Sequence, residues 1–245
     1  MDIQGSVALV SGANRGIGKA FVEALRQAGA RKIYAAARDA STLDGLVAGD
    51  EGRTVPLTLD ITDPAAIHAA ASQATDLTLL VNNAGIANFA GFIAAPSLED
   101  ARAEMEVNYF GSLEMIRAFA PILKANGGGA IVDLASIASL VNFPVIGSYC
   151  ASKAAAHSMI QGVRAELGAQ GTLVVGVYPG PVDTDMAKNF DMPKVPPERI
   201  AAAALGAVAK GLEDVFPDDM AEEMRTNLLR DPKAVEKQVG EMLPA

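Results

Sequence analysis

The sequence predicts an α/β protein, a single doubly wound domain whose parallel sheet is flanked by helices on both faces. Short apolar or β-branched runs alternate along the chain with alanine-rich segments of helical spacing. Most of these runs do not alternate with polar residues, as expected for parallel strands that are covered on both sides. A repeated strand-then-helix order requires right-handed crossovers within one parallel sheet. Because no linker or internal repeat interrupts the pattern, we expect residues 1–245 to form one domain.

The apolar runs place the expected strands at Val7–Ser11, Lys32–Ala37, Thr54–Leu59, Leu77–Asn82, Ala130–Leu134 and Leu173–Tyr178. Helices are expected between them, at Ile17–Ala28, Pro64–Ala74, Leu98–Lys124 and Ser148–Gly168. In the last fifth of the chain, a proline-rich stretch precedes a helix expected from Glu198 to about Gly211. After this helix we expect an edge strand near Val215–Phe216 and two short helices at Met220–Leu229 and Asp231–Leu243. The acidic residues of this region are expected to form a solvated face, namely Glu213, Asp214, Asp218, Asp219, Glu222 and Glu223.

The composition argues against several classes of function. The 245 residues carry 20 basic and 29 acidic side chains, and a net charge of −9 repels phosphate backbones and anionic lipid. We therefore expect neither a nucleic-acid partner nor a membrane partner. The one cysteine, Cys150, and the two histidines, His68 and His157, are too few and too scattered for a disulfide or a metal centre. The first residues show no secretory signal, so a cytoplasmic location is expected.

A glycine-rich turn follows the first expected strand and opens the first helix. It reads Ser11-Gly12-Ala13-Asn14-Arg15-Gly16-Ile17-Gly18. Glycines let the backbone approach a diphosphate at a helix N-terminus, where free amides and the helix dipole favour an anion. Nearby glycines also occur in ordinary packing turns, so the position after the first strand is what favours a cofactor site. The candidate cofactor residues here are Gly12, Asn14, Arg15, Gly16, Ile17 and Gly18.

From about Val7 to Met186 the sequence resembles the short-chain dehydrogenase/reductase family, in the branch that includes ketoacyl and carbonyl reductases. Besides the glycine-rich turn, the motifs are Asp60-Ile61, Asn82-Asn83-Ala84-Gly85 and Pro179-Gly180-Pro181-Val182-Asp183-Thr184, in the family's order. The resemblance implies a Rossmann-type NAD(P)-binding domain in which residues 186–245 form the substrate loop and C-terminal helices. It also implies that the cofactor is contacted by Asp60, Ile61, Asn83, Ala84, Gly85, Pro179, Gly180, Val182 and Thr184.

Tyr149 and Lys153 are the candidate catalytic pair, because they lie four residues apart at the start of an expected helix and share one face of it. A phenol with a pKa of about 10 is a poor acid–base catalyst at neutral pH, but a neighbouring ammonium and the positive ring of an oxidised nicotinamide favour the phenolate and lower that pKa. Hydride transfer to a carbonyl needs one proton at the developing alkoxide, and Tyr149 can supply it. Ser136, at the end of the fifth strand, can hydrogen-bond the same oxygen.

The resemblance adds roles that spacing alone does not give. It implies that Asn108 holds a water that relays protons towards Lys153. It also places the Lys153 ammonium on the nicotinamide ribose, so Tyr149 and Lys153 count as cofactor residues as well. A homo-oligomer is implied, paired through Leu98–Lys124 and Ser148–Gly168. Because the family's usual C-terminal strand is not recognisable after Gly211, both a homodimer and a homotetramer stay open.

Together these residues predict an oxidoreductase that transfers hydride between NADP(H) and a carbonyl or secondary alcohol, with Tyr149 as general acid or base. A hydrophobic ketone or aldehyde is favoured, because the expected pocket residues are mostly apolar: Ile86, Phe89, Phe92, the Leu140–Pro144 loop and Met186–Met192. Three alternatives stay open. They are an NAD(H)-dependent alcohol dehydrogenase, an imine reductase with the same site, and a non-catalytic NADP-sensing regulator with this fold.

The end of the second strand favours NADP(H) over NAD(H). Members of the family that use NAD usually place a carboxylate there, which accepts from the ribose 2′-hydroxyl. This chain has Ala36 at that position and no carboxylate until Asp39. Arg38 at the strand end and Arg15 in the glycine-rich turn are expected to converge on a 2′-phosphate, whose geometry and charge suit guanidinium groups. The alternative is that both arginines are ordinary surface residues and Asp39 binds the ribose.

Overall fold

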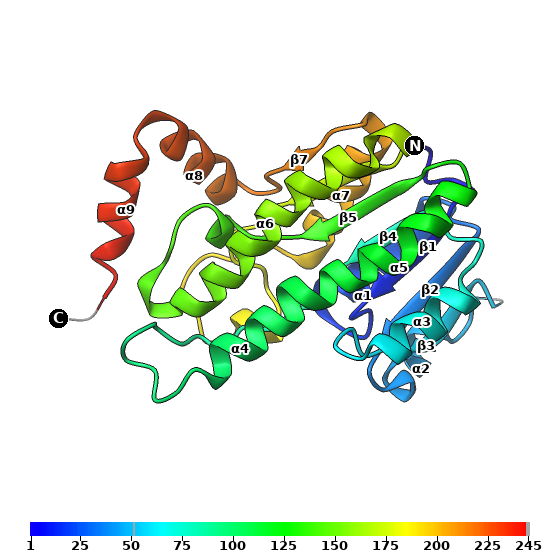
Figure 1. Ribbon diagram of the computed structural model, residues 1–245, viewed down its shortest axis with the longest axis horizontal. Coiled ribbons are helices and arrows are strands. Elements are labelled where there is room, and N and C mark those ends of the chain that lie inside the picture. Colours follow the sequence, from blue (N-terminus) through cyan, green and yellow to red (C-terminus); the bar gives the residue numbers. More distant parts are fainter. Residues whose placement is uncertain (51, 244–245) are drawn as a thin grey trace.

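A parallel sheet with the strand order β3-β2-β1-β4-β5-β6-β7 forms the centre of the protein in this computed structural model (Figure 1). The structure describes residues 1–50 and 52–243. The strands are β1 (Val7–Ser11), β2 (Lys32–Ala37), β3 (Thr54–Thr58), β4 (Leu79–Asn82), β5 (Ala130–Leu134), β6 (Leu173–Val177) and β7 (Asp214–Val215). The predicted doubly wound, Rossmann-type α/β fold is therefore confirmed.

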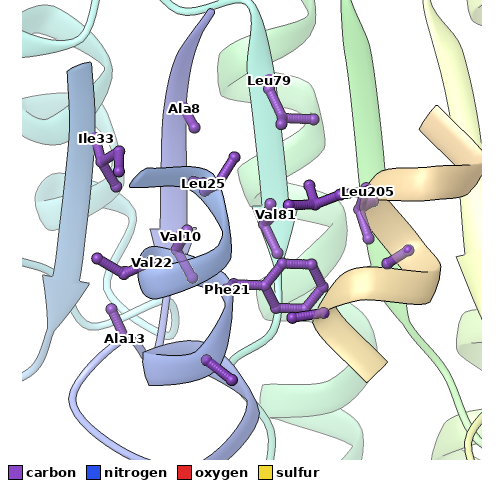
Figure 2. Packing of buried hydrophobic residues seen from close by; sticks show 14 of the residues in the cluster. Ala8, Val10, Ala13, Phe21, Val22, Leu25, Ile33, Leu79, Val81 and Leu205 are labelled. Carbon is purple, nitrogen blue, oxygen red and sulfur yellow. The ribbon is translucent and has the colours of Figure 1, made fainter. Parts of the chain in front are cut away.

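Helices cover both faces of this sheet. One face carries α1 (Gly16–Gln27), the short α2 (Asp44–Val47) and α7 (Pro197–Lys210), and the other carries α3 (Pro64–Gln73), α5 (Ser112–Ala125) and α6 (Gly147–Leu167). Successive side chains of β1 point to opposite faces of the sheet and pack against the two helical layers alternately. Ala8 and Val10 share a buried cluster with Phe21 of α1 and Leu205 of α7 (Figure 2), whereas Leu9 belongs to the cluster on the opposite face. Covering on both faces explains the continuous apolar runs of the sequence.

The strand order reverses between β1 and β4, which pair with each other at the centre of the sheet. Ligands of open parallel sheets bind beyond the C-terminal strand ends at such a reversal. Gly12 follows β1 and Asn83 follows β4, so two of the predicted cofactor motifs lie at this point.

The helix predicted at Leu98–Lys124 is interrupted near its middle. It consists of α4 (Glu99–Met105), a π-helical segment (Glu106–Gly111) and α5. The π-helical segment passes close to the chain after β3, since a Cβ on Gly111 would lie 2.9 Å from the Ile61 carbonyl oxygen. Such segments are frequent at functional sites, and this one contains Asn108.

From Asp219 onward the chain forms an arm of two helices, α8 (Asp219–Arg230) and α9 (Pro232–Gly240), drawn in orange and red in Figure 1. The prediction that the six acidic residues of this region are exposed to solvent is wrong for one of them, Asp218. Asp218 is 3% exposed, because it caps α8 and binds a backbone amide of the loop after β6. Within residues 1–50 and 52–243, no helix combines the length and apolar character needed to cross a membrane.

Candidate active site

The glycine-rich turn between β1 and α1 is fastened to the end of β4. Gly12 and Gly16 have φ of +64° and +51°, in the left-handed region that glycine adopts without strain. Gly18 admits no side chain, since a Cβ there would overlap the Gly12 carbonyl oxygen. Asn83 holds the turn in place, because its Nδ2 donates to the carbonyl oxygens of Ser11 and Gly12 at 2.8 and 3.1 Å. The glycine spacing therefore follows from the shape of this turn.

The N-terminus of α1 fits the diphosphate that the turn predicts. Arg15 occupies the N-cap position without a side-chain capping bond, and the first turn contains no acidic residue. The first amides of a helix have no acceptor within it, so those of Gly16 and Ile17 are left for a ligand at the positive end of the helix dipole. A Cβ on Gly16 would lie 3.1 Å from the Thr184 methyl group, which places Thr184 beside the same amides.

A cleft of about 830 Å³ brings most of the predicted site residues together. Those that line it are Arg15, Gly16, Ile17, Asn83, Gly85, Ser136, Tyr149, Lys153, Pro179, Gly180, Val182 and Thr184. A second group supports the cleft without lining it, namely Gly12, Gly18, Ala84 and Asn108, and Asn14 lies in the glycine-rich turn outside the lining. A third group lies beyond it at the ends of β2 and β3, namely Arg38, Asp60 and Ile61. Catalytic and nicotinamide-side candidates thus share one cavity with the glycine-rich turn.

Tyr149 and Lys153 lie one turn apart on α6 and both reach this cleft. Lys153 is 7% exposed, and its Nζ donates to the Leu134 carbonyl oxygen at 2.6 Å. The same Nζ lies 6.0 Å from the centre of the Tyr149 ring. Gly85 borders the ammonium as well, since a Cβ there would be 3.7 Å from Nζ. The end of β5 and the turn after β4 therefore fix the position of Lys153.

The pKa of Tyr149 lies above the ordinary value of a phenol. Burial raises it to about 12, and a hydrogen bond with Ser136 acts in the opposite direction. The ring keeps partial exposure to the cleft, but protein encloses the rest of it. The Lys153 ammonium points to Leu134, and burial lowers the pKa of Lys153 itself. The lowering of the Tyr149 pKa by the ammonium and an oxidised nicotinamide ring together stays a prediction. Tyr149 is accordingly a protonated phenol at neutral pH, the form that donates to an alkoxide.

Ser136 is held at the end of β5 by the short helical turn Ile137–Ser139. Its Oγ accepts from the Ala138 amide at 3.1 Å, and Ser139 Oγ in turn accepts from the Ser136 amide at 3.2 Å. Ser136 Oγ also donates to the Pro179 carbonyl oxygen at 3.4 Å. These bonds fix the hydroxyl beside Tyr149 and connect it to the loop after β6.

Asn108 fastens the loop after β4 and does not present a free side chain. Its Oδ1 accepts from the Ile86 amide, and its Nδ2 donates to the Ile86 carbonyl and to Ser152 Oγ, each at 2.9 Å. Both polar groups of the side chain are therefore engaged. These bonds tie the loop to α6, and the water-holding role that the family resemblance implies stays a prediction.

Two buried carboxylates near the candidate catalytic pair were not identified from the sequence. Glu104 is fully buried; its Oε1 accepts from the Asn88 amide at 2.7 Å, and its charge adds to the raised pKa of Tyr149. Asp133 is 2% exposed, and burial raises its pKa to about 6 against the opposing charge of Lys153. The available signals were a carboxylate one helical turn before Asn108 and a charged residue within an otherwise apolar strand.

The two arginines expected at a 2′-phosphate lie near different carboxylates. Arg15 Nη1 pairs with Asp185 at 2.9 Å, and both side chains are 69% exposed. Hydrogen bonds from Thr62 lower the pKa of Asp60, and the nearby Arg38 charge adds to this effect. The Arg15 pair contributes little stability, since exposed ion pairs generally do. An anion can therefore replace Asp185 at little cost in stability.

Asp39, the alternative ribose ligand, already has a structural role. Its Oδ1 accepts from the amide and the hydroxyl of Ser41, at 3.0 and 2.7 Å. These bonds lower the pKa of the Asp39 carboxyl and cap the short helical turn Ala40–Leu43, which was not predicted. The alternative assignment of Asp39 to the ribose is therefore weakened.

Apolar side chains line much of the cleft. Phe89 and Phe190 pack edge to face with ring centres 5.0 Å apart, and Phe89 adopts a strained φ of +57°. Phe92, expected in this pocket, lies outside it, with its ring against Gly147. The cleft is also lined by the methionines Met186, Met192, Met220 and Met242. Because the last two belong to α8 and the segment after α9, the C-terminal arm helps to build the cleft.

Comparison with known proteins agrees with this geometry. A sequence model described as short chain dehydrogenase matches residues 6–194. The 3-alpha-(or 20-beta)-hydroxysteroid dehydrogenase of Mycobacterium tuberculosis is 32% identical over 222 residues, which cover 85% of this chain and 79% of that protein. A crystal structure of a short chain dehydrogenase from Burkholderia cenocepacia in complex with NADP is 43% identical, with 100% of both chains covered and a TM-score of 0.93. A short chain dehydrogenase/reductase from Burkholderia phymatum in complex with NAD is 25% identical, with 96% of each chain covered and a TM-score of 0.84.

The doubly wound sheet and the glycine-rich turn at its reversal point indicate a nicotinamide-dependent oxidoreductase, and the candidate catalytic residues Ser136, Tyr149 and Lys153 line the same cleft as that turn. The chain belongs to the short-chain dehydrogenase/reductase family, which acts on alcohol and carbonyl groups. The predicted resemblance is confirmed over the matched residues.

Proposed function

We propose that the protein is an NADP(H)-dependent reductase of hydrophobic ketones or aldehydes, which also oxidises the corresponding alcohols. One observation carries this proposal: Ser136, Tyr149 and Lys153 converge on a single, largely apolar cleft that begins at the glycine-rich turn. The cofactor supplies the hydride when it is bound. The chain must then hold the carbonyl oxygen, provide one proton and exclude water from the reacting atoms.

Each of these tasks has a candidate residue. Ser136 Oγ, fixed by its short helical turn, holds the carbonyl oxygen. Tyr149 gives its phenolic proton to that oxygen as negative charge develops, and solvent restores the proton after release of the alcohol. Lys153, fixed by Leu134, would hold the ribose of the cofactor. The proton donor is ready at neutral pH, because burial keeps Tyr149 protonated.

The preference for NADP(H) rests on the end of β2. Ala36 stands where a carboxylate would favour NAD, and the exposed Arg38 follows the strand. The 43%-identical Burkholderia cenocepacia structure holds NADP, whereas the 25%-identical Burkholderia phymatum structure holds NAD. The higher identity of the NADP complex supports the same choice here.

The substrate class follows from the cleft lining. Phe89, Phe190 and the four methionines form an apolar part of this lining, which also contains the charged residues Arg15, Lys19, Glu23, Lys153, Asp183, Asp185 and Glu198. Methionine is flexible and polarizable, so a methionine-rich wall accepts bulky apolar shapes. The name of the Mycobacterium tuberculosis relative specifies a hydroxysteroid, which is a substrate of that kind. We therefore expect cyclic or aryl-substituted ketones to react better than small polyhydroxy ketones.

The test is the loss of NADPH absorbance with a panel of cyclic ketones, aryl ketones, aldehydes, imines and ketoses. We expect turnover of the hydrophobic carbonyls, faster with NADPH than with NADH. Turnover of imines alone would identify an imine reductase. Tight NADPH binding without turnover of any carbonyl would favour the nucleotide-sensing regulator, and faster turnover with NADH would favour the NAD(H)-dependent dehydrogenase.

A further inference from the structure

Asp218 is a buried carboxylate that the proposed chemistry does not use. It lies between β7 and α8, 3% exposed, while the other members of its acidic group lie at the surface. Burial of a carboxylate is costly unless hydrogen bonds satisfy it. The partners of Asp218 therefore indicate why it is there.

The two oxygens of Asp218 bind two different parts of the protein. Oδ1 accepts from the Ala221 amide at 2.9 Å, which is an N-cap bond of α8. Oδ2 accepts from the Gly180 amide at 2.8 Å, in the loop after β6. The approach is close, since a Cβ on Gly180 would lie 2.8 Å from Oδ1. Capping alone needs only the first of these bonds.

The same peptide unit is held from its other side by the catalytic serine. The Pro179 carbonyl oxygen accepts from the Ile137 amide at 3.1 Å and from Ser136 Oγ at 3.4 Å. The Pro179 carbonyl and the Gly180 amide belong to one planar peptide group, so a tilt at one end moves the other. Asp218 and Ser136 are therefore connected through a single rigid unit that lines the cleft.

The helix that Asp218 caps also lines the cleft. Met220, in the first turn of α8, faces the cavity, and its Cβ would lie 3.5 Å from a Cβ on Gly180. Arg199 anchors the entry to α8 from α7, because its Nε donates to the Pro217 carbonyl at 2.8 Å and its Nη2 pairs with Asp219 at 2.7 Å. The start of α8 is thus a fixed wall, and Asp218 is its link to the Pro179–Gly180 peptide.

We propose that Asp218 is a positioning residue of the reductase: it fixes the Pro179–Gly180 peptide, and through it the Ser136 hydroxyl, relative to the α8 wall of the substrate cleft. The inference rests on the proposed function for its kinetic consequences. Its structural consequence, protection of the Gly180 amide by Asp218, can be measured whether or not a substrate is known.

The decisive variant is Asp218→Asn, because it separates capping from positioning. Asparagine is as good an N-cap as aspartate, so its oxygen can keep the bond from Ala221. Its NH₂ group then faces the Gly180 amide, where donor meets donor and no bond forms. Asp218→Ala removes both bonds. Asp231→Ala is the matched control, since Asp231 caps α9 through the Ala234 amide at 2.9 Å and is exposed at the surface.

For Asp218→Asn we expect kcat/KM for the ketone to fall roughly 10- to 100-fold, because the Ser136 hydroxyl is no longer held in its productive position. We expect Tm to fall as well, because a buried charge-assisted hydrogen bond is lost. Hydrogen exchange at Gly180 should accelerate, and NADPH affinity in direct titration should change less than ketone turnover. Asp231→Ala should lower Tm without either effect. Asp218→Ala should show both the loss in kcat/KM and a lower Tm. If Asp218→Ala does not fold, the proposal is tested with Asp218→Asn alone.

Parental kcat/KM in folded Asp218→Asn, or a kinetic loss no greater than that of Asp231→Ala, would overturn the proposal. Unchanged exchange at Gly180 in the Asn variant would also overturn it, since the carboxylate would then not hold that amide. Failure of the proposed function has a different signature, because the parental protein would turn over no carbonyl while the Gly180 exchange still responded to Asp218→Asn.

Discussion

The Nζ atom of Lys153 donates to the Leu134 carbonyl oxygen at 2.6 Å, which directs the ammonium toward the end of β5. The neighbouring Tyr149 therefore gains little from the lysine charge, and burial raises the pKa of its phenol to about 12. The pair is arranged for proton donation at neutral pH. Reduction of a carbonyl uses the phenol as it stands, whereas oxidation of an alcohol requires its scarce phenolate.

This asymmetry predicts opposite pH responses in the two directions. Between pH 6 and 9, kcat/KM for alcohol oxidation should rise with pH by up to about tenfold per unit, because the phenolate fraction rises by that factor below the pKa. Reduction should change little over the same range. The measurement is a pair of pH profiles with one alcohol and its ketone. An oxidation profile that levels off below pH 7 would show that Tyr149 titrates far lower than its burial implies.

Glu104→Gln should make Tyr149 a better base. The charge of Glu104 adds to the raised pKa of Tyr149, and glutamine removes that charge while its oxygen can still accept from the Asn88 amide. The pKa of Tyr149 should fall, so alcohol oxidation at pH 7 should accelerate severalfold and the profile should move to lower pH. The control is Glu106→Gln, since Glu106 lies exposed two residues further along the same helix. Equal effects from both variants would contradict a specific role of Glu104.

Asp133→Asn should stabilise the fold at neutral pH. Burial raises the pKa of Asp133 to about 6 from its ordinary value of 3.8. The folded state thus retains a proton that the unfolded state releases as pH rises from 4 to 6, and the free energy of unfolding falls over that window. A shift of about two units corresponds to roughly 3 kcal/mol at pH 8.

Denaturant unfolding of Asp133→Asn at pH 5 and pH 8 measures this effect. The gain in free energy of unfolding should be larger at pH 8 than at pH 5 by about 1.4 kcal/mol, because part of the titration lies between them. The exposed Asp44→Asn variant should show no such difference. A gain for Asp133→Asn that is equal at both pH values would mean that the carboxyl is not the group that titrates.

Arg38→Ala should weaken the preference for NADPH. If Arg38 holds the 2′-phosphate, its loss removes a charge-assisted hydrogen bond, and the NADPH-to-NADH ratio of kcat/KM should fall by roughly one to two decades, mainly through KM. Arg31→Ala is the control, since Arg31 pairs with Asp76 at 3.8 Å at the start of the same strand. A parental enzyme that already prefers NADH would contradict the assignment of Arg38.

The sequence was sufficient for the sheet, because apolar runs covered on both faces leave little freedom in where strands begin and end. The bounds of β1, β2 and β5 agree with the prediction to the residue. The motifs also placed Ser136, Tyr149 and Lys153 in one cleft, since parallel strands bring their C-terminal ends to one edge.

Contacts between segments that are distant in the sequence could not be predicted. Asp218 resembles its exposed acidic neighbours in sequence, and only the approach of Gly180 distinguishes it. The direction of the Lys153 ammonium depends on the Leu134 carbonyl, which no side-chain pattern encodes. The hydrogen bonds between the Asn108 side chain and the backbone of Ile86 also could not be predicted, although the position of Asn108 in the sequence matched the family's pattern.

The role of Tyr149 as proton donor is tested by the turnover of Tyr149→Phe with NADPH and a hydrophobic ketone that the parental enzyme reduces. The substitution removes one hydroxyl and keeps the ring, so NADPH affinity in direct titration and Tm should stay close to the parental values. The rate of reduction should fall by about 10²–10⁴-fold, the usual loss when a general acid is removed. A rate close to the parental one, with NADPH still bound, would contradict the role of Tyr149 as proton donor and with it the proposed reaction.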